Sequence, residues 1–448
     1  MVGGELDLAF TYTVLDIVII AIAMVAAFVI CSKFMKSTEL SMAAAGVVAV
    51  IFGAAHGWTE APVKVIVEGL FTNLDLAIQF IFAAFFVNIY AASGSLNAIT
   101  RKLVSKIGNK WILMAFMAIF MLIPGALTGA GSVSIFVMGS LVGTIVSAMG
   151  VSKKKTTAFI FIFAILSAAC PPVNLWVMLM CAQANMPYTG FELLLLLPIA
   201  VVSIFSIIYL GWGAKPKSKE ELLAEIPEAS AKLNGFGGLI RMLLPIIVLI
   251  GLFAAGLVIP FSIPIIGLPG IFLCSAIAAM ICNPEKMSIK KYIKLFSDTV
   301  EQVFPLMATV LSVGIMQNAM AASGVKGLIG TAFVLLPVVW IYATALFFAP
   351  FGQGCMSYGS AVVIGTPLIF MFNTAGFDTT VVCAAMSLMF PIGDCLPPSR
   401  IVGRLAIENT GYEGSYMSFL KSILLPCLLL GLIALFMLIK PGLFSFLH

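Results

Sequence analysis

The sequence feature that most constrains the fold is a pair of adjacent prolines that occurs twice, each time inside an apolar stretch. Pro171-Pro172 recurs 226 residues later as Pro397-Pro398, in a chain of 448 residues. Residues 128–174 align with residues 354–400 at this offset without a gap. Two consecutive prolines remove two backbone donors and exclude a regular helix. Each half of the chain is therefore expected to contain one helix that is broken at an equivalent position.

Composition indicates which solvent surrounds these segments. Hydrophobic residues make up 62% of the chain and charged residues 10%, which is typical of membrane proteins. The net charge of +5 is small and lies mostly in loops, so it implies no nucleic-acid partner. Nine cysteines without a Cys-x-x-Cys pair and two distant histidines indicate neither a disulfide framework nor a metal site. The chain is expected to be an all-α polytopic protein of the inner (cytoplasmic) membrane, with the lipid bilayer as its surroundings.

The number of spanning helices predicts how the two halves are related. A spanning helix needs about 20 apolar residues. Five spans are expected in each half, and an odd number places the second half upside down relative to the first, as two inverted repeats. The expected spans lie near residues 12–32, 39–56, 74–93, 156–185 (broken) and 191–212, and near residues 238–259, 264–282, 300–322, 379–408 (broken) and 420–440.

Each half also contains an apolar segment interrupted by glycines, which we interpret as a re-entrant hairpin with its tip at membrane depth. The first hairpin is expected over residues 111–149, with its tip at Thr128–Ser132. The second is expected over residues 333–374, with its tip at Gly352-Gln353-Gly354.

The resulting organisation has three parts. The first inverted repeat covers residues 1–212, a polar cytoplasmic linker covers residues 213–236, and the second inverted repeat covers residues 237–448. Apolar positions at helical spacing between basic residues predict a helix over residues 95–110 that lies in the membrane interface.

The lysines and arginines give an independent test of this topology, because cytoplasmic loops collect basic residues. Of the 24 basic residues, only Lys64, Lys326 and Lys440 fall on the opposite side, with Arg400 discounted because it lies within a broken span. The topology has both termini outside the cytoplasm. The first hairpin then opens from the cytoplasm and the second from the exterior.

Breaks at the membrane centre predict binding sites. Half-helices expose N–H groups at one end and carbonyls at the other, which suit anions and Na⁺ respectively. Hydroxyl oxygens and glycines at the hairpin tips add further ligands and allow close approach. The alternative is that small residues only permit tight helix packing. The expected substrate-binding residues are Thr128, Gly129, Ser132, Asn174, Ser357, Ser399 and Arg400, and the expected sodium-binding residues are Gly131, Ser134, Cys170, Pro171, Gly354, Ser360, Gly393 and Asp394.

Asp394 and Arg400 are the ionisable residues that flank the second proline pair. Charges within a membrane are costly and indicate function. Arg400 has the geometry to hold a substrate carboxylate bidentately, and Asp394 can bind a cation or take up a proton. The alternative is an internal pair between the two that only stabilises the broken helix.

The sequence contains none of the motifs that identify common enzymes. It has no Gly-x4-Gly-Lys-Ser/Thr, Gly-x-Ser-x-Gly or His-Glu-x-x-His. We therefore predict that it is not an enzyme and uses no cofactor. The energy for solute movement is expected to come from an ion gradient or from the gradient of the substrate.

The run from Leu70 to Met180 and the stretch from Gly359 to Arg400, with their Gly/Ser tip and proline pairs, resemble the large membrane subunit of tripartite ATP-independent periplasmic (TRAP) transporters. The resemblance implies a scaffold and a mobile transport domain that moves as an elevator, Na⁺ coupling, and organic anions such as C4-dicarboxylates as substrates. It also implies two partners, a small four-helix membrane subunit and a soluble binding protein, neither of which is fused to this chain.

Two positions depart from the pattern of that family. Its first tip usually reads Ser-Gly-Ser, whereas this chain has Thr128-Gly129-Ala130-Gly131-Ser132. A small apolar residue and glycine usually follow the second proline pair, whereas Ser399-Arg400 follow it here. The chain either has the separate partners or transports alone.

The predicted function is import of a small organic anion coupled to Na⁺. A proton-coupled or stand-alone carrier of another carboxylate or of an amino acid is the alternative, and an anion channel is a further class. The sequence leaves the oligomeric state open, with a homodimer as one option.

Overall fold

The computed structural model describes residues 13–56, 61–214, 218–228, 230–258, 267–285, 287–397 and 400–448. Within these ranges every regular element is a helix, and ten helices are long and apolar enough to cross a membrane. The prediction of an all-α polytopic membrane protein is confirmed.

The first half follows the predicted order of spans, hairpin and broken helix, with one further helix, α3, directly before the third expected span. Its elements are α1 (Val14–Met35), α2 (Thr38–Ala55), α3 (Pro62–Thr72), α4 (Leu74–Ala92), α5 (Ser95–Lys106), α6 (Lys110–Thr128), α7 (Gly131–Ser134), the π-helix η1 (Ile135–Gly139), α8 (Ser140–Ala148), α9 (Lys153–Ala169), α10 (Leu175–Ala184) and α11 (Glu192–Gly211).

The linker and the second half continue this order. Their elements are α12 (Lys219–Ala224), η2 (Ala231–Leu233), α13 (Gly235–Val258), α14 (Gly267–Cys282), α15 (Ile289–Ala322), α16 (Val325–Leu335), α17 (Val338–Met356), the π-helix η3 (Ala361–Gly365), α18 (Thr366–Thr374), α19 (Thr379–Met389), η4 (Phe390–Cys395), α20 (Ile401–Thr410), α21 (Tyr416–Ile439), η5 (Pro441–Leu443) and η6 (Ser445–Leu447).

The elements of the two halves repeat at the offset of the proline pairs. The half-helices α9 and α19 begin 226 residues apart, and so do α10 and α20 and the two π-helices. The packing repeats as well, since η1 lies against α20 while η3 lies against α10. Each hairpin therefore contacts the broken helix of the other half.

Three boundaries differ from the sequence expectation. The span expected from residue 300 begins at Ile289, because Ser288 caps the helix by accepting a hydrogen bond from the backbone of Lys291. The second hairpin begins at Val338, because the preceding α16 is a separate helix. Its turn lies at Ser357 with φ 50°, not at Gly352-Gln353-Gly354, because α17 continues through those residues.

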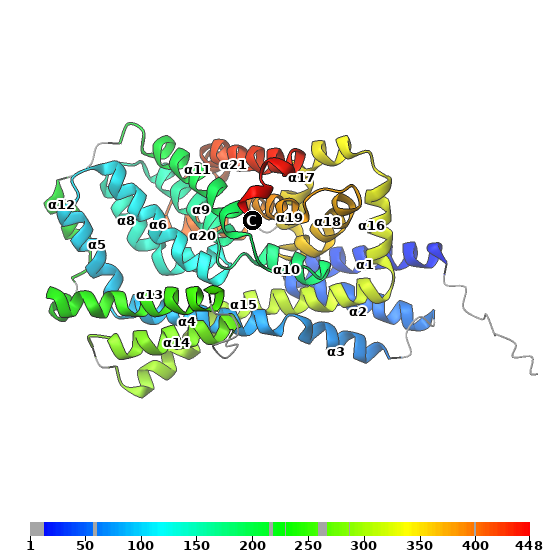
Figure 1. The fold of residues 1–448 in the computed structure, drawn as a ribbon, viewed down its shortest axis with the longest axis horizontal. Helices are drawn as coiled ribbons and strands as arrows, with labels where there is room; N and C mark the ends of the chain where they lie inside the picture. Colours follow the sequence, from blue (N-terminus) through cyan, green and yellow to red (C-terminus); the bar gives the residue numbers. More distant parts are fainter. Residues whose placement is uncertain are drawn as a thin grey trace, which may run out of the picture.

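The helices are arranged in two layers (Figure 1). In the lower layer α15 packs on α2, α3 and α4, and α14 packs on α4 and α13, while α1 packs on α2. The upper layer contains both hairpins, both broken helices, α11 and α21. The connecting helices α5 and α16 lie at opposite ends of the molecule and join the layers (Figure 1). Few elements touch across the boundary, among them α4 with α6 and α15 with η3.

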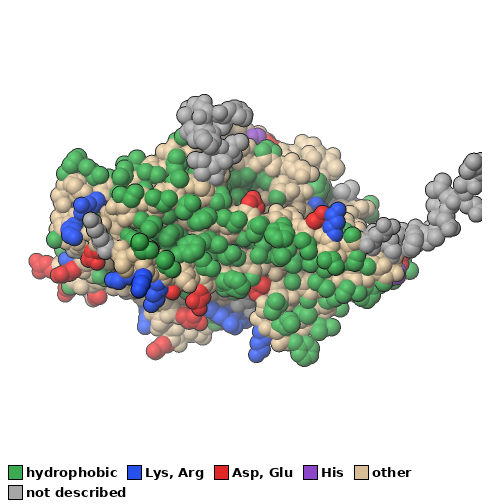
Figure 2. All heavy atoms as spheres, turned by 90° about the horizontal axis from the view of Figure 1, so that it is seen from below, with side chains coloured by type: hydrophobic (Ala, Val, Ile, Leu, Met, Phe, Trp, Pro, Cys, Tyr) green, Lys and Arg blue, Asp and Glu red, His purple; other side chains and the backbone are tan. Residues whose placement is uncertain are grey.

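A broad area of hydrophobic side chains extends over the lower face of the molecule, with charged side chains gathered beside it (Figure 2). Ile247 and Ile250 on α13 are 59% and 61% exposed, respectively. Such surface is unfavourable in water and suits lipid tails.

Basic residues of the first half bind the linker. Arg101 donates to the carbonyl of Ile226 at 2.6 Å, Lys110 to that of Ala214 at 2.8 Å, and Lys102 to that of Leu233 at 2.9 Å. The topology predicted from the lysines assigns these segments to the same side of the membrane, so the contacts agree with it. The division into inverted repeats and their orientation in the bilayer stay predictions.

Candidate functional site

The first helix break is closed by Asn174. Helix α9 ends at Ala169, and Asn174 caps α10 by accepting a hydrogen bond of 3.1 Å from the backbone N–H of Val177. Its Nδ2 donates to the carbonyl of Ala169 at 2.9 Å and to Ser387 Oγ at 3.1 Å. The Asn174 amide therefore satisfies backbone groups at the end of α9 and the start of α10, and its donors and its acceptor are used within the protein.

The tip of the first hairpin lies against this break. Gly129 ends α6 with φ 71°, a conformation that favours glycine. The N–H of Val173 donates to the carbonyl of Ala126 at 3.0 Å. The Thr128 hydroxyl, which was expected to bind substrate, donates to the carbonyl of Pro124 at 2.8 Å. Hairpin and break are thus held together by backbone groups.

The hydroxyl of Ser134, an expected sodium ligand, joins both limbs of the first hairpin to α9. The N–H of Gly125 donates to Ser134 Oγ at 2.7 Å, and Ser134 Oγ lies 2.9 Å from Ser167 Oγ. Gly125 has no room for a side chain, because a Cβ there would collide with Ser167 Oγ. Ser134 therefore has protein partners on two sides.

Gln353 connects the second hairpin with both broken helices. Its Nε2 donates to Asp394 Oδ1 at 2.8 Å, and its Oε1 accepts from Trp176 Nε1 at 2.8 Å and from Ser360 Oγ at 3.2 Å. Asp394 is 8% exposed and Gln353 1%. A carboxylate is thus held in the interior by the neutral amide of Gln353.

The two hairpin tips are in direct contact. The Tyr358 hydroxyl donates to the carbonyl of Gly129 at 3.0 Å, and its ring lies 4.9 Å from that of Trp176. Gly354 packs close to the carbonyl of Pro397, since a Cβ there would lie 3.1 Å from that oxygen. Both tips and both breaks therefore meet at one place, which we take as the candidate site.

Asp394 and Arg400 form no ion pair in the part of the chain that the structure describes. The Arg400 guanidinium carbon lies 4.8 Å from the centre of the Tyr416 ring, and the Tyr416 hydroxyl donates to the carbonyl of Cys395 at 2.7 Å. No described residue accepts a hydrogen bond from the Arg400 side chain. The geometry therefore does not show the alternative arrangement, in which Asp394 and Arg400 pair with each other and only stabilise the broken helix.

The remaining expected site residues lie in different surroundings. Gly393 packs against the carbonyl of Pro350, Gly131 packs against that of Ala164, and the carbonyl of Ser357 accepts from Ser360. Cys170 and Pro171, expected near sodium, line a largely apolar cavity of about 370 Å³ between α4, α6 and α13. Ser132 is half-buried, and Ser399, like Pro398, lies outside the described residues.

Sequence reasoning placed Gln353 at a tip without assigning it a partner, and it missed Trp176 and Tyr358. Their signal was an aromatic residue with a polar group, just after a helix break for Trp176 and just after a hairpin turn for Tyr358, since Trp and Tyr usually find a hydrogen-bond partner when they are buried. Within the described residues, no group of three or more His, Cys, Asp or Glu could hold a metal ion.

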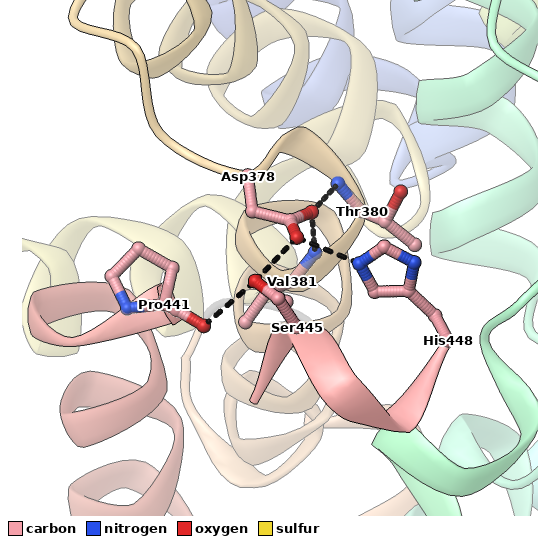
Figure 3. A network of polar contacts seen from close by, with 6 residues as sticks. All are labelled: Asp378, Thr380, Val381, Pro441, Ser445 and His448. Carbon is pink, nitrogen blue, oxygen red and sulfur yellow. Dashed lines mark hydrogen bonds and ion pairs between the residues drawn. The ribbon is translucent and has the colours of Figure 1, made fainter. Parts of the chain in front are cut away.

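A second polar network lies where the second hairpin joins α19 (Figure 3). Asp378 caps α19, and its Oδ2 lies 2.6 Å from both Ser445 Oγ and His448 Nε2. Burial opposes ionisation of this carboxyl, but the hydrogen bonds of Ser445, His448 and the Val381 backbone hold its pKa below the ordinary value. The last residues of the chain are thereby fixed to the start of the second broken helix.

Comparisons with known proteins identify the fold. No protein-family model and no curated protein sequence matches the chain. The YdaH transporter of Alcanivorax borkumensis has a similar structure, with a TM-score of 0.61 and 14% identity over 86% of this chain and 90% of that one. MtrF of Neisseria gonorrhoeae, described among antimetabolite efflux pumps, has a TM-score of 0.60 and 11% identity over 85% of this chain and 84% of that one. The chain has the fold of a multi-pass membrane transporter, whereas membership of the TRAP family is not shown.

Proposed function

We propose that this chain is a secondary active transporter that moves a small organic anion across the membrane together with Na⁺. The observation that carries the proposal is the meeting of both hairpin tips and both helix breaks, joined by the bonds Tyr358 to Gly129 and Gln353 to Asp394. Broken helices that meet in this way are typical of transport sites. The similarity to the YdaH transporter and to MtrF supports the same class of activity.

Alternating access is proposed to occur as an elevator. The upper layer would move as one body against the lower layer, with α5 and α16 as the connections. Two features support this motion: each layer packs mainly on itself, and few elements touch across the boundary. In a rocking mechanism, by contrast, the repeats themselves would move against each other, which would separate Tyr358 from Gly129.

The coupling ion is proposed to bind at Asp394. Among the described residues Asp394 has a neutral amide as its partner and no ion pair with a cation, which is costly for a buried carboxylate, so binding a cation there is favourable. The hydroxyl of Ser360 lies on the second hairpin, and the carbonyls of Gly393 and Pro397 lie on the same chain segment as Asp394. These groups offer the oxygen ligands that Na⁺ prefers. A proton is the alternative ion, because protonation would also neutralise Asp394.

The substrate anion is proposed to bind Arg400. Its guanidinium stacks on Tyr416, and its N–H donors have no acceptor within the described residues, so they are available for a carboxylate. Small donors at the tips, such as Ser132, and Ser399 beside Arg400 would complete the site. The proposal retains C4-dicarboxylates as the first substrates to test, in an inner-membrane protein that works with or without separate subunits and as a monomer or homodimer.

Export is the second candidate function. The observation that favours it is the similarity to MtrF, which is described among antimetabolite efflux pumps. In that case the ion would move inwards while the anion moves outwards.

Purified protein in proteoliposomes distinguishes these functions. A panel of carboxylates, amino acids and aromatic acids is offered with an inward gradient of Na⁺, of protons, or of neither. Saturable accumulation that requires Na⁺ is the expected result, whereas accumulation driven equally well in choline points to protons. Export predicts release of preloaded solute when the ion gradient is applied inwards. Linear, non-saturating flux without accumulation would contradict secondary transport and favour a channel.

A further inference from the structure

A polar cavity lies between the linker and α8, which is the second limb of the first hairpin. It is separate from the candidate site at the helix breaks. It has a volume of about 410 Å³, and its lining includes Ser140, Thr144 and Ser147 of α8, Lys153 of α9, and Asn409 and Thr410 of α20. A volume of this size holds a small solute with its water. The lining differs from that of the apolar cavity beside Pro171, because most of these side chains carry hydroxyl, amide or charged groups.

The three hydroxyls of α8 form a row. Ser140, Thr144 and Ser147 lie four and three residues apart and therefore share one face of the helix. Ser140 directly follows the π-helix η1, which itself follows the tip segment α7. The row thus runs from the hairpin tip toward the side of the membrane that carries the linker. Three exposed or half-buried hydroxyls on one face of a hairpin limb fit water better than lipid.

Asn409 gives an independent indication of a hydrated space. Its side-chain oxygen is buried and accepts no hydrogen bond from the described residues. The side chain lies over Gly139, where a Cβ would be 2.8 Å from that oxygen. A buried acceptor without a partner is uncommon unless water or a ligand supplies the donor.

The lining of the cavity contains one basic and one acidic residue. The basic residue is Lys153 at the start of α9. Glu225 of the linker is the acidic residue of the lining. The ammonium group of Lys153 offers a favourable partner to an anion inside the cavity.

The equivalent positions of the second repeat are occupied differently. At the offset of 226 residues, Phe370 corresponds to Thr144 and Gln183 to Asn409. Lys326 links these two, because its Nζ lies 5.6 Å from the centre of the Phe370 ring and donates to Gln183 Oε1 at 3.0 Å. Side chains that contact one another thus stand where the first repeat has its hydroxyl-lined cavity.

We propose that the cavity at Ser140, Thr144 and Ser147 is a water-filled vestibule through which small anions pass between the linker side of the membrane and the transport site. The inference rests on the proposed function, since it names the route by which the substrate reaches that site. It assigns the conformation described here to the state that is open on the linker side, with the opposite route closed at Phe370 and Lys326.

Thiol labelling tests the vestibule without knowledge of the substrate. Thr144→Cys is introduced into the full chain and treated, in membrane vesicles of either orientation, with small membrane-impermeant methanethiosulfonates of negative or positive charge. The control is Ile204→Cys on α11, a position 60% exposed among apolar residues. Labelling above that of the unsubstituted chain is measured, because the chain has nine cysteines of its own.

We expect Thr144→Cys to react from the linker side only, and at least roughly tenfold faster than Ile204→Cys, because a thiol in hydrocarbon is not ionised. Because Lys153 lines the cavity, Lys153→Gln should lower the rate of the anionic reagent relative to that of the cationic one. Equal rates at Thr144→Cys and Ile204→Cys, or reaction from the opposite side, would overturn the proposal.

The second test places a large side chain at Thr144, because the equivalent position of the second repeat is occupied by Phe370. Thr144→Phe should slow labelling of Ser140→Cys by roughly tenfold or more, whereas Thr144→Ser should leave it unchanged, because only the larger side chain fills the space. Unchanged labelling of Ser140→Cys behind Thr144→Phe would mean that the cavity is not the route. That result would contradict the vestibule but not the proposed roles of Asp394 and Arg400. Full transport by variants of Asp394 and Arg400 would instead contradict the proposed function, and it would not change the labelling of the cavity.

Discussion

Gln353 donates a hydrogen bond of 2.8 Å to Asp394, and through this bond the second hairpin holds the carboxylate of the second broken helix. The other end of the Gln353 amide accepts from Trp176, which belongs to the first broken helix. The Asp394 carboxylate is therefore connected, through Gln353, to elements of both halves. A cation that binds Asp394 would compete with the Gln353 N–H, so ion binding and the position of the hairpin are expected to be coupled.

Asp394→Asn should abolish ion-dependent transport. The substitution keeps the size of the side chain but removes the charge that would bind Na⁺ or a proton. We expect accumulation in proteoliposomes to fall by roughly tenfold or more, because loss of one charged ligand costs about 1.5–3 kcal/mol. Asp298→Asn is the matched control, since Asp298 is exposed on α15. A variant at Asp394 that still accumulates solute and responds to the Na⁺ gradient would contradict the role of this carboxylate.

Tyr358→Phe tests whether contact between the hairpin tips matters. The variant keeps the ring beside Trp176 and removes only the hydroxyl that binds the carbonyl of Gly129. The expected loss of stability is about 1–3 kcal/mol, because a buried carbonyl is left without its donor. Thermal unfolding in detergent, together with transport assays, measures the effect. Tyr209→Phe is the control, and equal behaviour of the two variants would show that the contact contributes nothing.

The sequence was sufficient to predict much of the fold, because its strongest signals are local. A proline pair breaks a helix whatever surrounds it, so the end of α9 at Ala169 and the start of α10 at Leu175 followed from Pro171-Pro172. The turn of the second hairpin was misplaced because Gly352 and Gly354 look like a tip. Both glycines instead lie inside α17, where they permit close packing on η3 and η4.

The candidate site was less predictable, because its contacts join residues that are far apart in the chain. The alignment of the repeats places Asn174 and Arg400 at equivalent positions, yet Asn174 caps a helix while Arg400 stacks on Tyr416. Trp176 and Tyr358 have no counterpart with the same chemistry in the other half, where Val402 and Ser132 stand. Comparison of the repeats could show that the halves differ, but not which tertiary partner each residue finds.

Arg400→Ala should reduce transport of a carboxylate substrate by roughly 10- to 100-fold, because a bidentate charged hydrogen bond is lost. Arg400→Lys should recover only part of this activity, since a lysine offers no planar pair of donors. Arg404→Ala, one turn further along α20 and exposed, is the control. Uptake of a neutral solute by Arg400→Ala at the original rate would strengthen the assignment, while unchanged carboxylate uptake would refute it.

Asp378→Asn should change the pH dependence of stability. Because the pKa of Asp378 is lowered in the folded protein, its ionised form stabilises the fold above the ordinary value of 3.8, and this contribution is lost as the pH falls through the lowered pKa. Asparagine still caps α19 but lacks the charge that binds Ser445 and His448. Thermal midpoints at pH 3 to 7, values chosen to bracket the usual range of aspartate, should show the parent protein losing its advantage at the acidic end. A difference between parent and variant that does not change with pH would contradict the linkage.

Gly125→Ala tests how tightly the first hairpin packs on α9. The new methyl group would collide with Ser167 Oγ and lie 2.8 Å from Ser134 Oγ, so it would displace the hydroxyl that accepts from the N–H of Gly125. Overpacking of this kind costs about 1–3 kcal/mol, and we expect a lower thermal midpoint together with slower transport. Gly251→Ala is the matched control, because a Cβ there meets nothing within 4 Å and alanine favours the helix. If Gly125→Ala is as stable and as active as Gly251→Ala, the close contact between hairpin and broken helix is not needed for either property.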